Sequence, residues 1–335
     1  MLYNIKIISV SVGILLAIYV IVQMFVPTYI GSDPIEVEIP EGVSFRDAME
    51  ILQDKNLIRD KNIFILLGRL TSMDRKIRAG YYAFWGYMSP YQVYKRFSEG
   101  RIIEFEVTIN EGDSLNEIRQ KLASKGIVSS EVFDSIARDR NFLMSLNIDS
   151  PSLEGYIYPD TYKFPKGARA STVIKVMVGR LRQQYTEEMQ KRMAEMGWTE
   201  NQVLTLASII EREAVVDRER RIISGVYHNR LKAGMPLQAD PTAIYGVKSY
   251  KEKIYKKDLL RQTSYNTYII KGLPPGPIAS PSIQSIKAAL FPADVPYFYF
   301  VSRNDGTHIF SKTLAEHNQA IRSVQGGRDQ SQRSS

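Results

Sequence analysis

The alternation of apolar and polar positions divides the chain into one long apolar run and a patterned remainder. Residues 7–26 carry no charge, and a helix of that length, rising about 1.5 Å per residue, spans the roughly 30 Å hydrocarbon layer of a membrane. After it, period-two alternation predicts short strands, and a period of 3.6 residues predicts amphipathic helices. The mixture indicates an α+β fold whose second half is mostly helical, with one small β-hairpin.

The apolar run predicts a transmembrane helix or an uncleaved signal anchor over residues 1–30. A cleaved signal peptide is the alternative, but the run is longer than a usual signal core and no small-x-small cleavage site follows it. Lys6 lies on its amino-terminal side, whereas residues 27–45 hold acids and no Lys or Arg. By the positive-inside rule we expect a single-pass protein of the cell inner (plasma) membrane, with its bulk periplasmic or otherwise extracytoplasmic.

An internal repeat follows the anchor. Residues 37–45, VEIPEGVSF, align with residues 107–115, VTINEGDSL, at a constant offset of seventy positions. In each copy an alternating strand enters a Glu-Gly turn, and a serine, Ser44 or Ser114, stands where a helix N-cap is expected. The helices that these serines would begin cover residues 45–53 and 115–123.

The repeated unit resembles the LysM module, a small βααβ unit that binds the N-acetyl sugars of peptidoglycan or chitin. The sequence EGDSLNEI at residues 111–118 is similar to the opening of that module. We therefore expect a LysM-like repeat region over residues 31–140. For the first copy, the alternative of a duplicated scaffold that spaces the rest of the chain from the membrane is equally open.

A change in composition near residues 140–152 predicts a linker between two domains. The sequence before it forms the repeat region, and residues 141–325 form a second, motif-dense domain. The last ten residues, 326–335, are polar and poor in apolar side chains, and this composition predicts a disordered tail.

The strongest chemical signal lies in residues 206–242, where an apolar helix runs into two carboxylates, Glu211 and Glu213. A carboxyl that leaves a buried helix face has its pKa raised by desolvation, as a general acid needs at neutral pH. A solvated helix end is the alternative. The two residues lie about 200° apart around the helix, so they cannot face the same bond. Glu213 has the more apolar flank, because it stacks over Ile209 and Ile210.

Helix caps and turns outline the rest of this domain. A capping box of Thr199 and Gln202 starts the carboxylate-bearing helix, and Asp240-Pro241 is expected to cap and begin a short one. Further predictions are a helix over 172–196 ending at Gly197, a helix over 218–232 ending before Gly234, a helix starting at Ser280-Pro281, a hairpin over 297–310, and a last helix capped by Thr313 and Glu316.

Net charge and composition limit the kinds of partner that the chain is expected to bind. The 44 Lys and Arg against 36 Asp and Glu give a net charge of +8, which suits an anionic membrane surface, cell-wall polymer or nucleic acid. Outside the cytoplasm nucleic acid is the least suitable of these, so none is expected. The chain has no cysteine, and its three histidines, His228, His308 and His317, are isolated. No metal site is therefore expected.

Several long motifs in a fixed order resemble the endolytic murein transglycosylases of the MltG (YceG-like) type. The motifs are LEGYIYPDTY at 153–162, LASIIEREA at 206–214, YHNRLKAGMPLQADPT at 227–242, YNTY at 265–268, GLPPGPI at 272–278 and YFYFVSRNDGTHIFSKTLAEH at 297–317. The resemblance implies a lytic transglycosylase domain over 141–325. It also implies cleavage of peptidoglycan strands internally, between N-acetylmuramic acid (MurNAc) and N-acetylglucosamine (GlcNAc), leaving 1,6-anhydroMurNAc ends.

The resemblance points to Glu213 as the catalytic acid, with Glu211 as a structural or supporting carboxylate. Relatives often carry a hydroxyl residue after this Glu, where this chain has Ala214.

One carboxyl can suffice without cofactor, metal or water. The acid protonates the glycosidic oxygen, and the carboxylate then takes the proton of the muramyl C6 hydroxyl as that oxygen attacks C1. The family analogy places the activity on nascent strands beside synthases such as penicillin-binding proteins, where it would end elongation.

Supporting roles fall on polar and aromatic side chains suited to hydroxyl and N-acetyl groups. These are Asn229, Gln238, Asp240, Tyr245, Asn266, Tyr268 and Glu154. For Asp240 a helix cap is an alternative role, and for Glu154 a turn-stabilising one. The alternatives for the whole protein are a non-catalytic peptidoglycan-binding scaffold or regulator and a hydrolytic muramidase.

Overall fold

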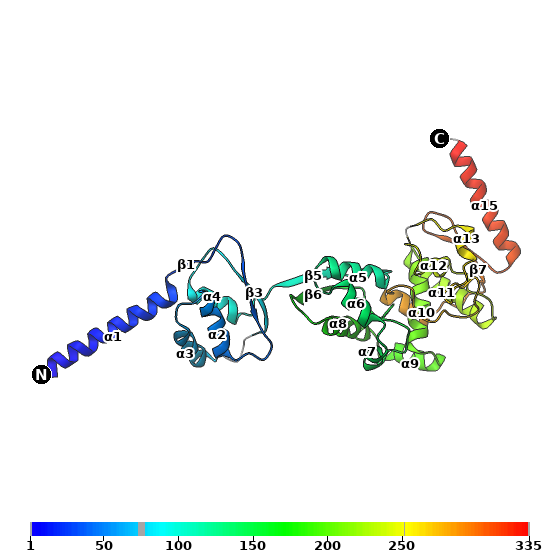
Figure 1. Cartoon of the computed structure of the whole chain (residues 1–335). Coiled ribbons are helices and arrows are strands. Elements are labelled where there is room, and N and C mark those ends of the chain that lie inside the picture. Colours follow the sequence, from blue (N-terminus) through cyan, green and yellow to red (C-terminus); the bar gives the residue numbers. More distant parts are fainter. Residues whose placement is uncertain (1, 73–77, 251, 334–335) are drawn as a thin grey trace. The chain divides into compact units, whose positions relative to one another are not determined.

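The structure is a computed structural model that describes residues 2–72, 78–250 and 252–333 of the chain. Its described residues form helices and four two-stranded sheets, which confirms the α+β fold class. The chain divides into two compact units (Figure 1). Unit 1 comprises Met1–Glu106 and Lys163–Ala168, and unit 2 comprises Val107–Tyr162 and Arg169–Ser335.

Unit 1 begins with the long helix α1 (Leu2–Phe25), the blue helix of Figure 1. Within it, residues Ile7–Phe25 are long and apolar enough to cross a membrane. Most side chains from Ile7 to Phe25 are exposed. Length, composition and exposure of this kind are those of a membrane-spanning helix or of a signal sequence.

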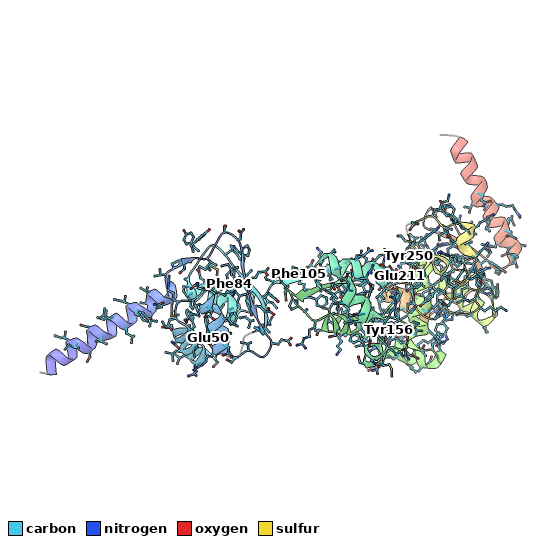
Figure 2. The ribbon with its side chains drawn as sticks, in the orientation of Figure 1. Glu50, Phe84, Phe105, Tyr156, Glu211 and Tyr250 are labelled. Carbon is cyan, nitrogen blue, oxygen red and sulfur yellow. The ribbon has the colours of Figure 1, made fainter. Side chains whose placement is uncertain are left out.

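The rest of unit 1 is a small core between strands and helices. Its elements are β1 (Thr28–Tyr29), β2 (Ile35–Ile39), α2 (Phe45–Asp54), α3 (Lys61–Thr71), β3 (Gly80–Phe84), β4 (Tyr87–Met88) and α4 (Pro90–Ser98). Strands β2 and β3 pair antiparallel, from Ile35 opposite Phe84 to Ile39 opposite Gly80. Strands β1 and β4 pair in the same way. Phe84, labelled in Figure 2, is fully buried with Phe64 and Phe97.

Both copies of the internal repeat begin with the same turn and helix cap. The side chains of Ser44 and Ser114 accept hydrogen bonds from the third backbone N–H of α2 and of α5 (Leu115–Ser124), as the sequence predicts. Gly42 and Gly112 take left-handed φ values of 80° and 76°, which the tight turn before each helix requires. Helix α3 follows in the first copy and α6 (Ser130–Ala137) in the second.

The copies differ in how their sheets close. In the first copy β3 follows α3 and pairs with β2. In the second copy β5 (Glu104–Thr108) pairs with β6 (Thr161–Pro165), which comes only after α7 (Arg140–Ser145) and a packed loop. The βααβ order of the prediction is therefore present in the first copy and interrupted in the second. That the repeat region binds sugars as LysM modules do stays a prediction from the sequence.

The boundary between the units lies at residues 106 and 107, not at the linker expected near 140–152. That segment contains α7, and its Ser150 and Ser152 are buried. The backbone N–H of Leu153 donates to the carbonyl of Ala137 at 3.0 Å. The second repeat copy thus belongs to the same compact unit as the motif-dense helices, because this connection is packed rather than solvated.

Unit 2 is built around α10 (Glu200–Glu213), whose residues 203–210 are all buried. A helix that is buried on every side needs neighbours on every side, and α14 (Ile283–Leu290) and α11 (Asp217–Lys232) pack against it. The other elements are α8 (Ala170–Arg182), α9 (Glu187–Met196), α12 (Asp240–Ile244), α13 (Lys256–Leu259), β7 (Tyr299–Ser302), β8 (His308–Ser311) and α15 (Leu314–Arg333).

Most predicted caps and turns of unit 2 are confirmed. Thr199 and Gln202 form the capping box of α10, and Gly197 ends α9 in the left-handed conformation with φ 65°. Strands β7 and β8 form the expected antiparallel hairpin. Thr313 accepts from the backbone N–H of Glu316 at 3.2 Å.

Four boundaries differ from the prediction. The expected helix over 172–196 is two helices, because Thr186 caps a new helix with acids in its first turn. Ala239 takes the N-cap position of α12, so Asp240 is its first residue and not its cap. Helix α14 starts after Ser282, not at Ser280. Helix α15 extends through Arg333 into residues 326–335, where the polar composition predicts disorder, and residues 334–335 lie outside the described part.

Candidate active site

Glu213 is the last residue of α10 and lines a cavity of about 390 Å³. The helix ends there because Ala214 turns to an extended conformation, with φ −81° and ψ 115°. A buried helix thus delivers a carboxyl, only partly exposed, to the cavity wall. The other lining residues are Arg230, Leu237, Gln238, Asp240, Tyr268, Phe300, Val301, Ser302, Asn304, His308, His317, Ile321, Val324 and Gln325.

The surroundings of Glu213 favour its neutral form. Burial raises the pKa of its carboxyl to about 8, and the negative charge of Asp240 adds to the rise. The Tyr227 hydroxyl, the backbone N–H of Asp240 and the charge of Arg212 lower the pKa in part. No ion pair neutralises Glu213 among the residues that the structure describes. At neutral pH most copies therefore carry a proton on this carboxyl.

Tyr227, on α11, lies close to the Glu213 carboxyl. Its side chain is 1% exposed and contacts the edge of the Phe300 ring, with centroids 5.8 Å apart. Burial and the charge of Glu213 raise the pKa of Tyr227 well above its usual range, so the phenol keeps its proton. Within the described residues its hydroxyl makes no hydrogen bond of good geometry. The phenol is thus a free donor that would stabilise a carboxylate at Glu213.

Asp240 and Tyr268 form a pair at the same cavity. The Tyr268 hydroxyl donates to Oδ1 of Asp240 at 2.5 Å. Burial raises the pKa of Tyr268, and the Asp240 charge raises it further. Because the tyrosine remains a donor, one oxygen of Asp240 is occupied and the other is left to accept from a ligand hydroxyl.

Arg230 builds the wall between α11 and the hairpin. It is 6% exposed, and its guanidinium donates to the carbonyls of Phe298 at 2.6 Å and Leu237 at 2.7 Å. It also donates to the side-chain oxygen of Gln238 at 3.4 Å. Gln238 has a left-handed φ of 50°, a conformation that costs energy for a residue with a Cβ. Its backbone N–H donates to Thr267 at 3.0 Å, so neighbours on both sides hold it there.

A buried contact between a histidine and a carboxyl fastens the hairpin to α11. Nδ1 of His308, on β8, lies 2.7 Å from Oε2 of Glu219, and their side chains are 6% and 9% exposed. The backbone N–H of His308 donates to the other Glu219 oxygen at 3.4 Å. The pair fixes the imidazole in the cavity wall. Sequence reasoning passed over both Glu219 and Tyr227, although their spacing of eight positions places them on one buried face of α11.

Glu211, labelled in Figure 2, is not among the residues that line this cavity. Its side chain is 6% exposed and forms an ion pair with Nη1 of Arg220 at 3.0 Å. Its other oxygen accepts from the backbone N–H of Ser282 at 2.8 Å and from the Ser282 hydroxyl. Glu211 therefore joins α10 to α11 and to the N-cap of α14.

Two of the predicted supporting residues, Asn229 and Asn266, are engaged elsewhere. The amide of Asn229 donates to the carbonyls of Val295 at 2.7 Å and Tyr297 at 2.9 Å, which anchors the chain before β7. Asn266 is fully buried and holds its own loop by donating to the Leu259 and Arg261 carbonyls. His228 likewise contacts the Ala289 carbonyl through Nε2 at 2.8 Å.

Glu154 and Tyr245 lie together at a second cavity, of about 570 Å³. The Tyr245 hydroxyl donates to Oε2 of Glu154 at 2.8 Å, and the backbone N–H of Leu115 donates to both oxygens. Burial raises the pKa of Glu154 to about 8. Of the predicted residues, the structure thus brings Gln238, Asp240 and Tyr268 to Glu213, and it groups Glu154 with Tyr245 instead.

Within residues 2–72, 78–250 and 252–333 no three His, Asp or Glu side chains cluster so as to hold a metal ion. The cavity wall combines one protonated carboxyl with hydrogen-bonding groups and aromatic faces. Such an arrangement can donate a proton to a polyhydroxylated ligand and take one back.

Comparison with known proteins gives consistent matches along the chain. The model of the YceG-like family matches residues 37–323. An endolytic murein transglycosylase of Bacillus subtilis (strain 168) is 31% identical over 302 residues, covering 85% of this chain and 83% of the relative. One from Streptococcus pneumoniae serotype 2 (strain D39) is 26% identical over 323 residues, covering 86% of this chain and 58% of the relative. The crystal structure of a yceG-like protein from Listeria monocytogenes aligns with a TM-score of 0.59 at 32% identity, covering 85% of this chain and 98% of that one.

Proposed function

The chain belongs to the YceG-like family, and we propose that it is an endolytic peptidoglycan lytic transglycosylase with Glu213 as its catalytic acid. One observation carries the proposal. A carboxyl whose pKa is raised to about 8 lines an open cavity without an ion pair among the described residues. A group of this kind is a proton donor at neutral pH, where an ordinary carboxyl is already ionised.

The bond cleaved is the glycosidic bond between MurNAc and GlcNAc within a strand. Glu213 gives its proton to the glycosidic oxygen, and the bond from that oxygen to muramyl C1 breaks with its electron pair going to the oxygen. The muramyl C6 oxygen attacks C1, and its proton passes to the Glu213 carboxylate. The products are a free GlcNAc hydroxyl and a 1,6-anhydroMurNAc end, and the acid is regenerated without water.

Neighbouring groups assist each stage. The Tyr227 phenol, which keeps its proton, faces the carboxylate that forms when Glu213 donates. Stabilising that carboxylate lowers the barrier, because the charge exists only after the substrate has taken the proton. Gln238, Asp240 and Tyr268 lie on the same cavity and offer amide, carboxylate and phenol groups to sugar hydroxyls.

The proposal includes membrane attachment through α1. Residues Ile7–Phe25 cross the plasma membrane once and hold both units on the outer side. Anchored there, the enzyme acts on nascent strands beside the synthases and ends their elongation. Co-purification of the full chain with a penicillin-binding protein from membranes tests this part, and its repeated absence counts against it.

Product analysis separates the proposal from its rivals. Purified full-length protein is incubated with isolated sacculi, and the soluble products are resolved by mass spectrometry. Anhydro ends, lighter than reducing ends by one water, are expected from the first turnover. Reducing ends would instead indicate a hydrolytic muramidase. Binding to sacculi without any product would indicate the non-catalytic scaffold or regulator.

A further inference from the structure

Helix α1 and the first folded strands of unit 1 form one packed body rather than a helix on a loose tether. Met24 is 8% exposed and belongs to the core of unit 1. The guanidinium of Arg59 donates to the Val22 carbonyl at 3.0 Å and to the Thr28 hydroxyl at 2.8 Å. The rings of Phe25 and Tyr91 contact each other with centroids 5.3 Å apart. The surface beside Phe25 is therefore held at a fixed, short distance from the apolar helix.

These contacts also indicate where the hydrocarbon layer ends. A guanidinium is costly inside hydrocarbon, so Arg59 and the Val22 carbonyl that it binds lie outside it or at its edge. The Tyr19 hydroxyl donates to Asp60 at 3.3 Å, which places a second polar pair one turn earlier. The carboxyl-terminal end of α1 thus lies at the boundary of the hydrocarbon layer that Ile7–Phe25 cross, and the surface packed against it lies at the level of the lipid headgroups.

That surface carries exposed aromatic side chains. Tyr29 is 55%, Trp85 47% and Tyr87 76% exposed, and the rings of Tyr29 and Tyr87 contact each other across the β1–β4 pair with centroids 5.0 Å apart. Tryptophan and tyrosine rings concentrate at membrane interfaces, because each has an apolar body and a polar tip. Exposed aromatic patches are uncommon on protein surfaces that contact only water, so these rings indicate an interaction surface.

Basic side chains surround a hollow beside the aromatic rings. The hollow measures about 370 Å³ and is lined by Trp85, Tyr87, Met88, Gln92, Lys95, Arg96, Glu99 and Arg101. Three cations face one carboxylate there, and Glu99 pairs with Arg101 at 2.7 Å. The Arg96 guanidinium lies 4.4 Å from the centroid of the Trp85 ring. An excess of positive charge beside aromatic rings suits the phosphate of an anionic phospholipid headgroup.

We propose that this face of unit 1, comprising Tyr29, Trp85, Tyr87, Lys95, Arg96 and Arg101, is embedded in the headgroup layer of the membrane that α1 crosses. The hollow receives the phosphate of an anionic phospholipid. We call this set the interfacial face. The inference rests on the membrane attachment proposed above, and it adds that unit 1 itself is seated on the lipid and not merely tethered to it.

The tryptophan content permits a direct test, since the chain has two, Trp85 and Trp198. In the full-length variant Trp198→Phe, Trp85 is the single reporter. The protein is reconstituted into vesicles of phosphatidylglycerol and phosphatidylcholine with bromine atoms either near the headgroup or deep in the acyl chain. We expect the shallow bromines to quench the fluorescence about twofold more than the deep ones. Equal, negligible quenching by both would overturn the proposal.

A second reporter separates failure of the face from failure of the anchor. In the background Trp85→Phe and Trp198→Phe, the change Leu15→Trp places a tryptophan within α1, where deep bromines should quench it. If that reporter is quenched and Trp85 is not, the interfacial face is refuted while the anchor stands. If neither is quenched, both are refuted.

Charge variants test the phospholipid. Replacing phosphatidylglycerol by phosphatidylcholine alone should shift the emission of Trp85 to longer wavelength, and Lys95→Gln with Arg101→Gln should reproduce that shift in anionic vesicles. Lys191→Gln, which removes a charge from α9 of unit 2, is the matched control and should leave the emission unchanged. An emission that ignores both lipid charge and these substitutions would contradict the phosphate site.

Discussion

Arg220 forms an ion pair with Glu211 through Nη1 and Oε1 at 3.0 Å, and the two side chains are only 13% and 6% exposed. Glu213, two positions further along the same helix, has no such partner among the described residues and lines the cavity instead. The carboxyl that forms the buried ion pair is therefore the structural one. What distinguishes the two is the partner that each side chain reaches, not the amount of apolar surface around it.

Loss of the Glu211 pair should destabilise the fold. Glu211→Gln leaves the buried Arg220 guanidinium with only the exposed Asp217, at 3.1 Å, as a charged partner, and breaking a buried pair in this way costs about 3–5 kcal/mol. Urea unfolding of the full chain in detergent measures the change. Any molecules that remain folded should still produce anhydro ends. A stable variant that has lost only its activity would move the catalytic role to Glu211.

The pH dependence of the reaction should follow the carboxyl of Glu213. Its pKa of about 8 means that the acid form is lost as the pH rises through that value. We expect kcat/KM on purified glycan strands to be constant between neutral pH and the pKa. Above the pKa it should fall about tenfold for each pH unit. A fall centred near pH 5, the range of an ordinary carboxyl, would contradict the assignment.

Tyr227→Phe should change both the rate and this profile. Removing the hydroxyl takes away a group that lowers the pKa of Glu213, so the fall in kcat/KM should move to higher pH. The rate at neutral pH should drop about tenfold or more, since the carboxylate formed in the reaction loses a donor. Tyr265→Phe, which removes the hydroxyl of a ring that contacts Tyr245 at the other cavity, is the control. An unmoved profile would exclude a role for Tyr227.

Glu154 should make the fold less stable at alkaline pH. Its pKa rises from 4.5 in an ordinary carboxyl to about 8 in the folded protein. Between these values the folded state binds more protons than the unfolded state, so stability falls as the pH rises. The loss attributable to this 2% exposed group is about 2–4 kcal/mol between pH 5 and pH 9.

Glu154→Gln removes this titration. The variant should lose less stability than the wild type between pH 5 and pH 9, as measured by thermal unfolding at each pH. Glu187→Gln, at the exposed start of α9, serves as the control and should follow the wild type. If the Glu154→Gln and wild-type curves run parallel, the buried carboxyl is not protonated as described.

Local signals of the sequence predicted most helix caps and the β-hairpin. The caps at Ser44, Ser114 and Thr199 form as expected, because each depends on a hydrogen bond between residues three positions apart. The hairpin of β7 and β8 follows from its Asn-Asp-Gly turn in the same way. The break at Thr186 was missed, since the apolar period continues through it and only the cap interrupts the helix.

Contacts between residues far apart in the sequence determine the side-chain partners and the unit boundary that the sequence did not predict. Asn229 looks suited to a sugar, but its amide is taken by carbonyls more than sixty positions away. Glu154 and Tyr245 meet across ninety-one positions and so form a pair of their own. The unit boundary at residue 106 likewise depends on how the second repeat copy packs. Such pairings leave no local periodicity, so composition and spacing do not reveal them.

The most direct measurement compares products released from sacculi by wild-type protein, Glu213→Gln and Glu154→Gln. Each substitution puts an amide of the same shape in place of a carboxyl. Both carboxyls have a pKa raised to about 8, but they lie at different cavities. Mass spectrometry should find 1,6-anhydroMurNAc ends with the wild type and with Glu154→Gln. With Glu213→Gln these ends should fall by about a thousandfold or more, while the circular dichroism spectrum is unchanged. Normal release of anhydro ends by folded Glu213→Gln protein would contradict the account.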